Sequence, residues 1–124
     1  MIPSIRVQDV QRSLDFYEGK LGFTVARGTA ADGNVALTRR DERVMLEAAG
    51  DFYSSAYNDA IRARLGAPSP HAFYLEEPDL EAYYETLQKA GVEIVDPLAD
   101  RPWGQVEFTA ADADGNWLTF WRRS

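Results

Sequence analysis

An internal repeat constrains the fold of this chain more than any other feature. Asp9 and Asp79 are equivalent positions of the repeat, 70 residues apart. After each of these aspartates, apolar residues recur at intervals of three and four. That spacing places apolar side chains on one face of a helix, and an aspartate directly before a helix is a typical N-cap. Gly22 and Gly91 follow the two patterns, as glycines do at helix ends. The sequence therefore predicts two copies of one supersecondary unit.

Stretches rich in β-branched residues predict strands around both helices. In the first copy these stretches are 2–7, a strand that begins at 23–25, 35–38 and 44–47. In the second copy they are 72–76, 92–95, 105–108 and 117–121. Loops are expected at 28–34 and at 96–102, where glycine, asparagine, aspartate and proline gather. Each copy thus has the order strand, helix, strand, strand, strand, and one copy alone leaves a sheet face uncovered.

We therefore expect an α+β fold of two tandem βαβββ modules within a single domain, 1–124. Module 1 spans 1–48, a connector spans 49–70, and module 2 spans 71–124. The connector contains a short stretch, 59–65, that could form a helix, and it could cover a cavity or serve as an interface.

Composition and charge exclude several classes of protein. The chain of 124 residues has no cysteine, which excludes disulfides and thiolate metal sites. Its net charge of −7 argues against a nucleic-acid partner, because a basic surface is needed to neutralise phosphates. We expect no membrane association, since no apolar run approaches the ~20 residues of a spanning helix. The N-terminus lacks the features of a signal peptide, so the expected location is the cytoplasm.

The last quarter of the chain predicts a β-hairpin. A rigid corner, Pro102-Trp103-Gly104, leads into one strand, and a turn at Asp114-Gly115-Asn116 leads into an aromatic return strand. Gly115 and Asn116 are expected to supply the positive-φ conformations that such a turn needs.

Taken together, the motifs resemble the vicinal oxygen chelate superfamily of glyoxalases, extradiol dioxygenases and bleomycin-resistance proteins. The resemblance covers nearly the whole chain and is closest to the bleomycin-resistance-like branch. It rests on Asp9-Val10, Leu14-Asp15-Phe16-Tyr17, Leu21-Gly22-Phe23, Arg101-Pro102-Trp103-Gly104, Glu107-Phe108 and Asp112-x-Asp114-Gly115-Asn116. Proteins of that branch are generally dimers with clefts built from both chains, so the resemblance implies a homodimer that binds a small molecule.

The resemblance also implies where a divalent metal would be held, because enzymes of the superfamily use His, Gln or Glu from four strand positions. In this chain those positions fall at Ile2, Ala72, near Leu46, and at Thr119. The remaining candidate donors are Glu47, one residue from its position, and His71, which reads more simply as a residue at a strand start. A one-residue offset turns a strand side chain to the other face. Since such metals need several imidazole or carboxylate donors, we expect no metal, no cofactor and no catalytic residue.

If the family's strand register holds, an aromatic-rich wall faces a cleft between the sheets. Glu76, Glu107 and Asp112 are nearby candidates to bind a cationic group of the ligand. Arg6 could pair with one of them or with a ligand carboxylate. Aromatic residues on strands are also often ordinary core. The ligand-binding residues predicted are Trp103, Trp117, Thr119, Trp121, Tyr74, Glu76, Arg6 and Phe52.

Three hypotheses for function follow. The first is a non-catalytic binder of a small aromatic or hydrophobic molecule, with antibiotic resistance by sequestration as one use. The second is an enzyme of the same fold (a lyase, isomerase or dioxygenase), with or without metal, that would use Glu47, Glu76 or Tyr74 as acid or base. The third is a protein-interaction module that docks through 49–70. Residues 26–36 contain no aromatic side chain, which is unlike the bleomycin-binding pattern and makes bleomycin itself a less expected ligand.

Overall fold

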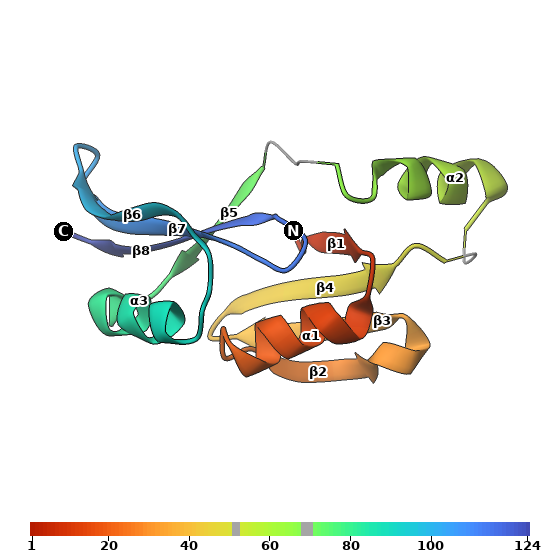
Figure 1. Ribbon diagram of the computed structural model, residues 1–124, viewed down its shortest axis with the longest axis horizontal. Helices are drawn as coiled ribbons and strands as arrows, with labels where there is room; N and C mark the ends of the chain where they lie inside the picture. Colours follow the sequence, from red (N-terminus) through yellow and green to blue (C-terminus); the bar gives the residue numbers. More distant parts are fainter. Residues whose placement is uncertain (51–52, 68–70) are drawn as a thin grey trace. The chain divides into compact units, whose positions relative to one another are not determined.

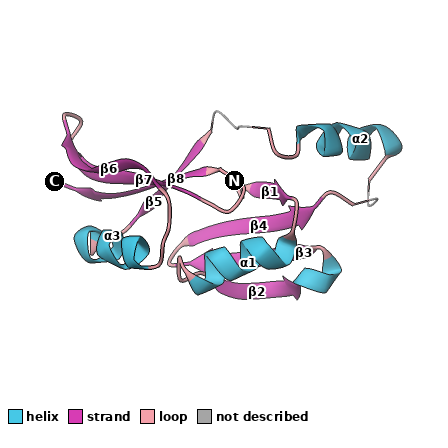
Figure 2. Cartoon of the chain, in the orientation of Figure 1, coloured by secondary structure: helices cyan, strands magenta, loops and turns pink. Residues whose placement is uncertain are grey.

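The computed structural model describes residues 1–50, 53–67 and 71–124. The chain forms two compact units, Met1–Ala67 and Pro68–Ser124, and each is described by itself. Figures 1 and 2 show that both units contain a β-sheet with a helix against it. The assignment of both units to a single domain stays a prediction.

The first unit contains a four-stranded sheet in the order β1-β4-β3-β2. Strand β1 runs parallel to β4, whereas β3 is antiparallel to both β4 and β2. Its elements are β1 (Ser4–Val7), α1 (Val10–Gly19), β2 (Thr24–Thr29), the 3-10 turn η1 (Ala30–Asp32), β3 (Asn34–Arg39), β4 (Glu42–Ala48) and α2 (Ser55–Arg64).

The second unit repeats this topology, with the sheet order β5-β8-β7-β6 and β5 parallel to β8. Its elements are β5 (Ala72–Glu76), α3 (Leu80–Lys89), β6 (Ile94–Arg101), β7 (Gln105–Ala111) and β8 (Trp117–Arg123). The predicted α+β fold of two tandem βαβββ modules is therefore confirmed.

Both predicted helix starts are correct, but the two aspartates act differently. Asp9 accepts a hydrogen bond from the backbone N–H of Arg12 at 3.1 Å, as an N-cap side chain should. Asp79 occupies the N-cap position of α3 without such a bond. Its backbone N–H instead donates to the Glu77 carboxylate at 3.1 Å.

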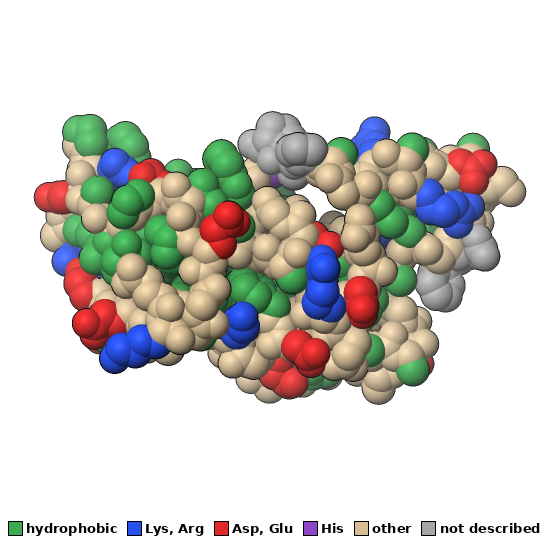
Figure 3. Space-filling view, viewed as in Figure 1, with side chains coloured by type: hydrophobic (Ala, Val, Ile, Leu, Met, Phe, Trp, Pro, Cys, Tyr) green, Lys and Arg blue, Asp and Glu red, His purple; other side chains and the backbone are tan. Residues whose placement is uncertain are grey.

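One face of each sheet is buried and forms the core. In the first unit Ile5, Leu46 and Val35 are almost completely buried, and strand pairing places them side by side. In the second unit Phe108 and Phe120 stack with their ring centroids 5.3 Å apart. We call the opposite face of each sheet its open face. Figure 3 shows hydrophobic side chains gathered at the surface of the second unit, with acidic and basic side chains around them.

Two local predictions are wrong. The loop expected at 96–102 is mostly strand, because β6 continues to Arg101. Register shifts between Ile94 and Ala99 let β6 pair with β7 despite a proline in its sequence. In the β7–β8 turn only Gly115 has a positive φ, at 85°. Asn116 contributes a side-chain amide that donates to the Asp112 carboxylate at 2.9 Å.

Candidate functional site

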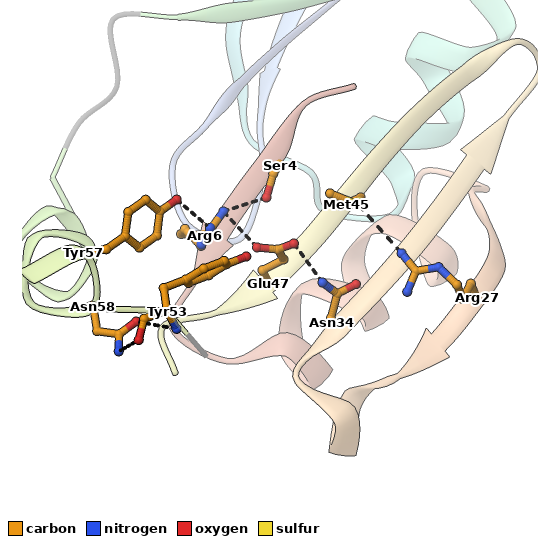
Figure 4. Close-up of polar contacts among 9 residues, drawn as sticks. All are labelled: Ser4, Arg6, Arg27, Asn34, Met45, Glu47, Tyr53, Tyr57 and Asn58. Atoms are coloured by element: carbon orange, nitrogen blue, oxygen red, sulfur yellow. Dashed lines mark hydrogen bonds and ion pairs between the residues drawn. The ribbon is translucent and has the colours of Figure 1, made fainter. Parts of the chain in front are cut away.

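Strand alternation and register bring a charged cluster to the open face of the first sheet. Arg6 on β1, Glu47 on β4 and Asn34 on β3 are direct neighbours across three strands. Figure 4 shows Arg6 in an ion pair with Glu47, with 2.9 Å between Nη1 and Oε2, while Asn34 Nδ2 donates to the other carboxylate oxygen at 2.8 Å. The side chains of Arg6 and Glu47 are 16% and 8% exposed. The cluster is therefore largely shielded from water.

Local turn chemistry places Asn34 at the start of β3. Thr29 and Asp32 form a capping box around η1, in which each side chain accepts a hydrogen bond from the other residue's backbone N–H. Gly33 then adopts a φ of 73°, which turns the chain into β3. Among the described residues, Asn34 Oδ1 is buried and accepts no hydrogen bond.

Tyr53, just before α2, and Tyr57, in the first turn of α2, extend this cluster. Arg6 Nη2 donates to the Tyr57 hydroxyl at 3.0 Å, and the guanidinium carbon lies 5.6 Å from the Tyr53 ring centroid. The two rings are 4.6 Å apart and tilted, and Ser54 caps α2 by accepting from the Tyr57 N–H. Figure 4 shows both rings against the guanidinium. Phe52, predicted to bind ligand, lies outside the described residues.

The open face of the first sheet has two hollows. A pocket of about 290 Å³ is lined by Ile2, Ala26, Arg27, Ala36, Leu37, Thr38, Arg43, Val44 and Met45. A pocket of about 250 Å³ is lined by Asp32, Gly33, Asn34, Glu47, Ala48 and Tyr53. Both volumes are at or below the small end of the range for ligand sites, about 300 to 1,000 Å³.

The two residues at the expected metal position near Leu46 lie on opposite faces of β4. Leu46 is fully buried on the core face, whereas Glu47 lies on the open face, paired with Arg6. Sequence spacing alone could not decide between the two faces, because they alternate with every residue. His71, the other candidate donor, is exposed just before β5. Among residues 1–50, 53–67 and 71–124, the His, Asp and Glu side chains form no group of three that could hold a metal ion.

Aromatic residues occupy the open face of the second sheet. Register pairs Tyr74 with Thr119 and Glu76 with Trp121, while Trp117 precedes them on the same face of β8. Tyr74 is 58% exposed and Trp117 is 46% exposed, so neither ring is core. Trp121 is half-buried, and Glu76 is exposed at the end of β5. The grouping that alternation predicted is therefore what the strand register produces.

Two pairs of polar groups lie beside these aromatic residues on the same face of the sheet. The indole N–H of Trp103, in the β6–β7 turn, donates to the carboxylate of Glu107, and Glu107 is buried beside Trp121. The hydroxyls of Thr109 and Thr119 are 2.8 Å apart, so each supplies the other with a hydrogen-bond partner. Thr109 was not predicted, although its odd-numbered position on β7 puts it on the face of Glu107.

Asp112, considered above as a partner for a cation, has a structural role in the β7–β8 turn. Its carboxylate accepts hydrogen bonds from the backbone N–H groups of Asp114 and Asn116 at 2.9 and 2.8 Å. These bonds close the β7–β8 turn that leads into Trp117.

The family model of the Glyoxalase/Bleomycin resistance protein/Dioxygenase superfamily matches residues 3–120, and the chain belongs to this superfamily. A bleomycin resistance protein from Geobacillus stearothermophilus is 29% identical over 129 residues, which cover 98% of this chain and 95% of that protein. The crystal structure of UcmS2 has a TM-score of 0.75 and 26% identity, covering 97% of this chain and 94% of its own. The resemblance derived from the sequence motifs is thereby confirmed.

The fold also matches the crystal structure of TnmS3, an antibiotic binding protein from Streptomyces sp. CB03234. The TM-score is 0.68 at 23% identity, over 99% of this chain and 93% of that chain. None of the helices within the described residues is long and apolar enough to cross a membrane.

Proposed function

We propose that this chain is a non-catalytic binding protein for a small aromatic or hydrophobic molecule, held on the open face of the second sheet. The observation that carries the proposal is the exposure of Tyr74 and Trp117 on a face made of regular strands. Large aromatic rings bury much apolar area when they are covered, so leaving two of them in water on one face favours a stacking partner.

The polar groups beside the aromatic rings would make this face selective among aromatic ligands. Glu107 is 4% exposed and is held by the Trp103 indole, which is itself 62% exposed. A ligand that stacks on Trp117 and carries a positive or N–H group would find the Glu107 carboxylate as its acceptor. The ligand-binding set proposed on this face is therefore Trp103, Tyr74, Glu76, Trp117, Thr119 and Trp121. Ligand binding by Arg6 and Phe52 of the first unit stays a prediction from the sequence.

Sequestration of an antibiotic is the use that the relatives favour. The similar proteins from Geobacillus stearothermophilus and Staphylococcus aureus are bleomycin resistance proteins, at 29% identity over nearly the whole chain. Sequestration requires that the protein bind the antibiotic, and it requires no reaction of the antibiotic. An open face with aromatic rings for stacking and one buried carboxylate agrees with this role. The proposal includes a homodimer and no resident metal.

Binding is tested by titrating the full chain with metal-free bleomycin and with planar aromatic antibiotics such as an anthracycline, followed by tryptophan emission and calorimetry. We expect saturable quenching by at least one compound, weakened about tenfold or more in Trp117→Ala and largely kept in Trp117→Phe, which retains a ring. Val95→Ala is the matched control, since Val95 is an exposed apolar residue of the same unit. No saturable response to any compound, or equal weakening in the control, contradicts the proposal.

Two further measurements separate this function from an enzyme of the same fold. Calorimetric titration with Zn²⁺, Ni²⁺ and Mn²⁺ should show no stoichiometric site of micromolar affinity, and such a site would favour the enzyme. Sedimentation equilibrium should give twice the mass of one chain, and a monomer at all concentrations would contradict the homodimer.

A further inference from the structure

Two arginines lie on the open face of the first sheet, apart from the Arg6–Glu47 cluster. Arg27 on β2 pairs with Ala36, and Arg43 on β4 pairs with Thr38. Both line the pocket of about 290 Å³, whose remaining lining is mainly apolar and includes Met45. A register shift between Val25 and Arg27 inserts one extra residue in β2. Such bulges re-aim the side chains that follow them, and here the shift turns Arg27 to the open face.

Both guanidinium groups belong to exposed residues, and neither forms an ion pair within the described residues. Arg27 donates to the thioether sulfur of Met45 at 3.8 Å, a contact drawn in Figure 4, and thioether sulfur is a weak acceptor. Among the described residues Arg43 makes no hydrogen bond or ion pair. By contrast, Arg6 on the same face forms an ion pair with Glu47 of the neighbouring strand, β4.

From this arrangement we propose a second ligand site on the first unit, which binds a small, flat molecule that carries a carboxylate. Guanidinium groups bind carboxylates through paired hydrogen bonds in a fixed plane. The apolar lining around Ala36 and Met45 would cover the body of the ligand. The pocket volume limits the ligand to one or two fused rings. All the residues involved belong to the first unit, so the site does not depend on the function proposed for the second sheet.

The test uses the full chain, labelled with ¹⁵N, and two probes of the same shape: 2-naphthoate and naphthalene-2-carboxamide. We expect 2-naphthoate to bind about tenfold more tightly, because charge-assisted hydrogen bonds are stronger than neutral ones. Its chemical-shift changes should centre on the backbone N–H groups of Ala36 and Met45. Affinity should fall when the salt concentration is raised.

Arg27→Gln and Arg43→Gln should each weaken 2-naphthoate binding about tenfold. Arg64→Gln is the matched control, because it removes the same charge from an exposed position on α2 of the same unit. Its affinity should stay within about twofold of the parent chain, as expected for a distant surface charge. Amide spectra of all variants show directly that each is folded.

The proposal is overturned if the two probes bind equally well, or if Arg64→Gln weakens binding as much as the pocket variants. It is also overturned if the shift changes are confined to the second unit. Shift changes confined to the second unit would instead agree with aromatic binding near Trp117, whereas failure of antibiotic binding there would leave the carboxylate site intact.

Discussion

Replacing Glu47 by glutamine should lower the free energy of unfolding by about 2 kcal/mol. Removing one member of a fully buried ion pair costs about 3–5 kcal/mol, whereas exposed pairs contribute about 1 kcal/mol or less. The side chains of Glu47 and Arg6 are 8% and 16% exposed, which places this pair between the two limits. The glutamine keeps an oxygen that can accept the Asn34 amide, so the loss is chiefly that of the ion pair. Urea unfolding followed by circular dichroism measures the change.

A double-mutant cycle isolates the interaction itself. Glu47→Gln, Arg6→Met and the double variant should give a coupling energy of about 1–2 kcal/mol. The matched control is the exposed pair of Asp59 and Arg62 on α2, whose side chains are 75% and 45% exposed. Its coupling should be below about 0.5 kcal/mol. Equal couplings for the two pairs, or a loss below about 0.5 kcal/mol in Glu47→Gln, would refute the reasoning.

The remaining predictions concern the second unit. Phe120→Ala should cost about 3–5 kcal/mol in urea unfolding, because the ring is fully buried; a loss below about 1 kcal/mol would show that it is not core. Asp112→Ala should cost about 1–2 kcal/mol and lower Tm, since three N–H donors of the β7–β8 turn lose their acceptor; an unchanged Tm contradicts this. The hydrogen bond from Arg122 lowers the pKa of Glu81, so its stabilising contribution is present above the ordinary carboxyl pKa and is lost as pH falls through the lowered value. In an NMR titration Arg122→Gln should raise the Glu81 pKa toward its ordinary value, and an unmoved pKa would count against the pairing.

Much of the fold could be predicted because the chain's local signals agree with one another. Two helical patterns with aspartates before them define α1 and α3, and period-two alternation defines which strand residues share a face. Alternation along each strand, with the register that the resemblance implies, grouped Tyr74 with Glu76 and Trp117 with Thr119, and the β5–β8 pairing produces the same grouping.

Features that depend on register or on irregular backbone could not be predicted. Glu47 differs from Leu46 only by one step along β4, and no local signal says which of them faces the helix. Strand β6 continues through a stretch rich in loop-forming residues because bulges absorb its proline. The contacts of Arg6 with Tyr57 join residues 51 positions apart, and no short-range pattern encodes such a contact.

The most direct test of the central claim is an NMR titration that follows the three tryptophan indole N–H signals of the chain. Trp103, Trp117 and Trp121 all belong to the proposed binding set, so a bound aromatic molecule must change their magnetic environment through its ring current. We predict that bleomycin or a planar antibiotic shifts the Trp117 indole signal in a saturable way, with Trp103 following as its bond to Glu107 is perturbed. If all three indole signals stay in place with every compound while backbone signals elsewhere move, the open face of the second sheet is not the binding site.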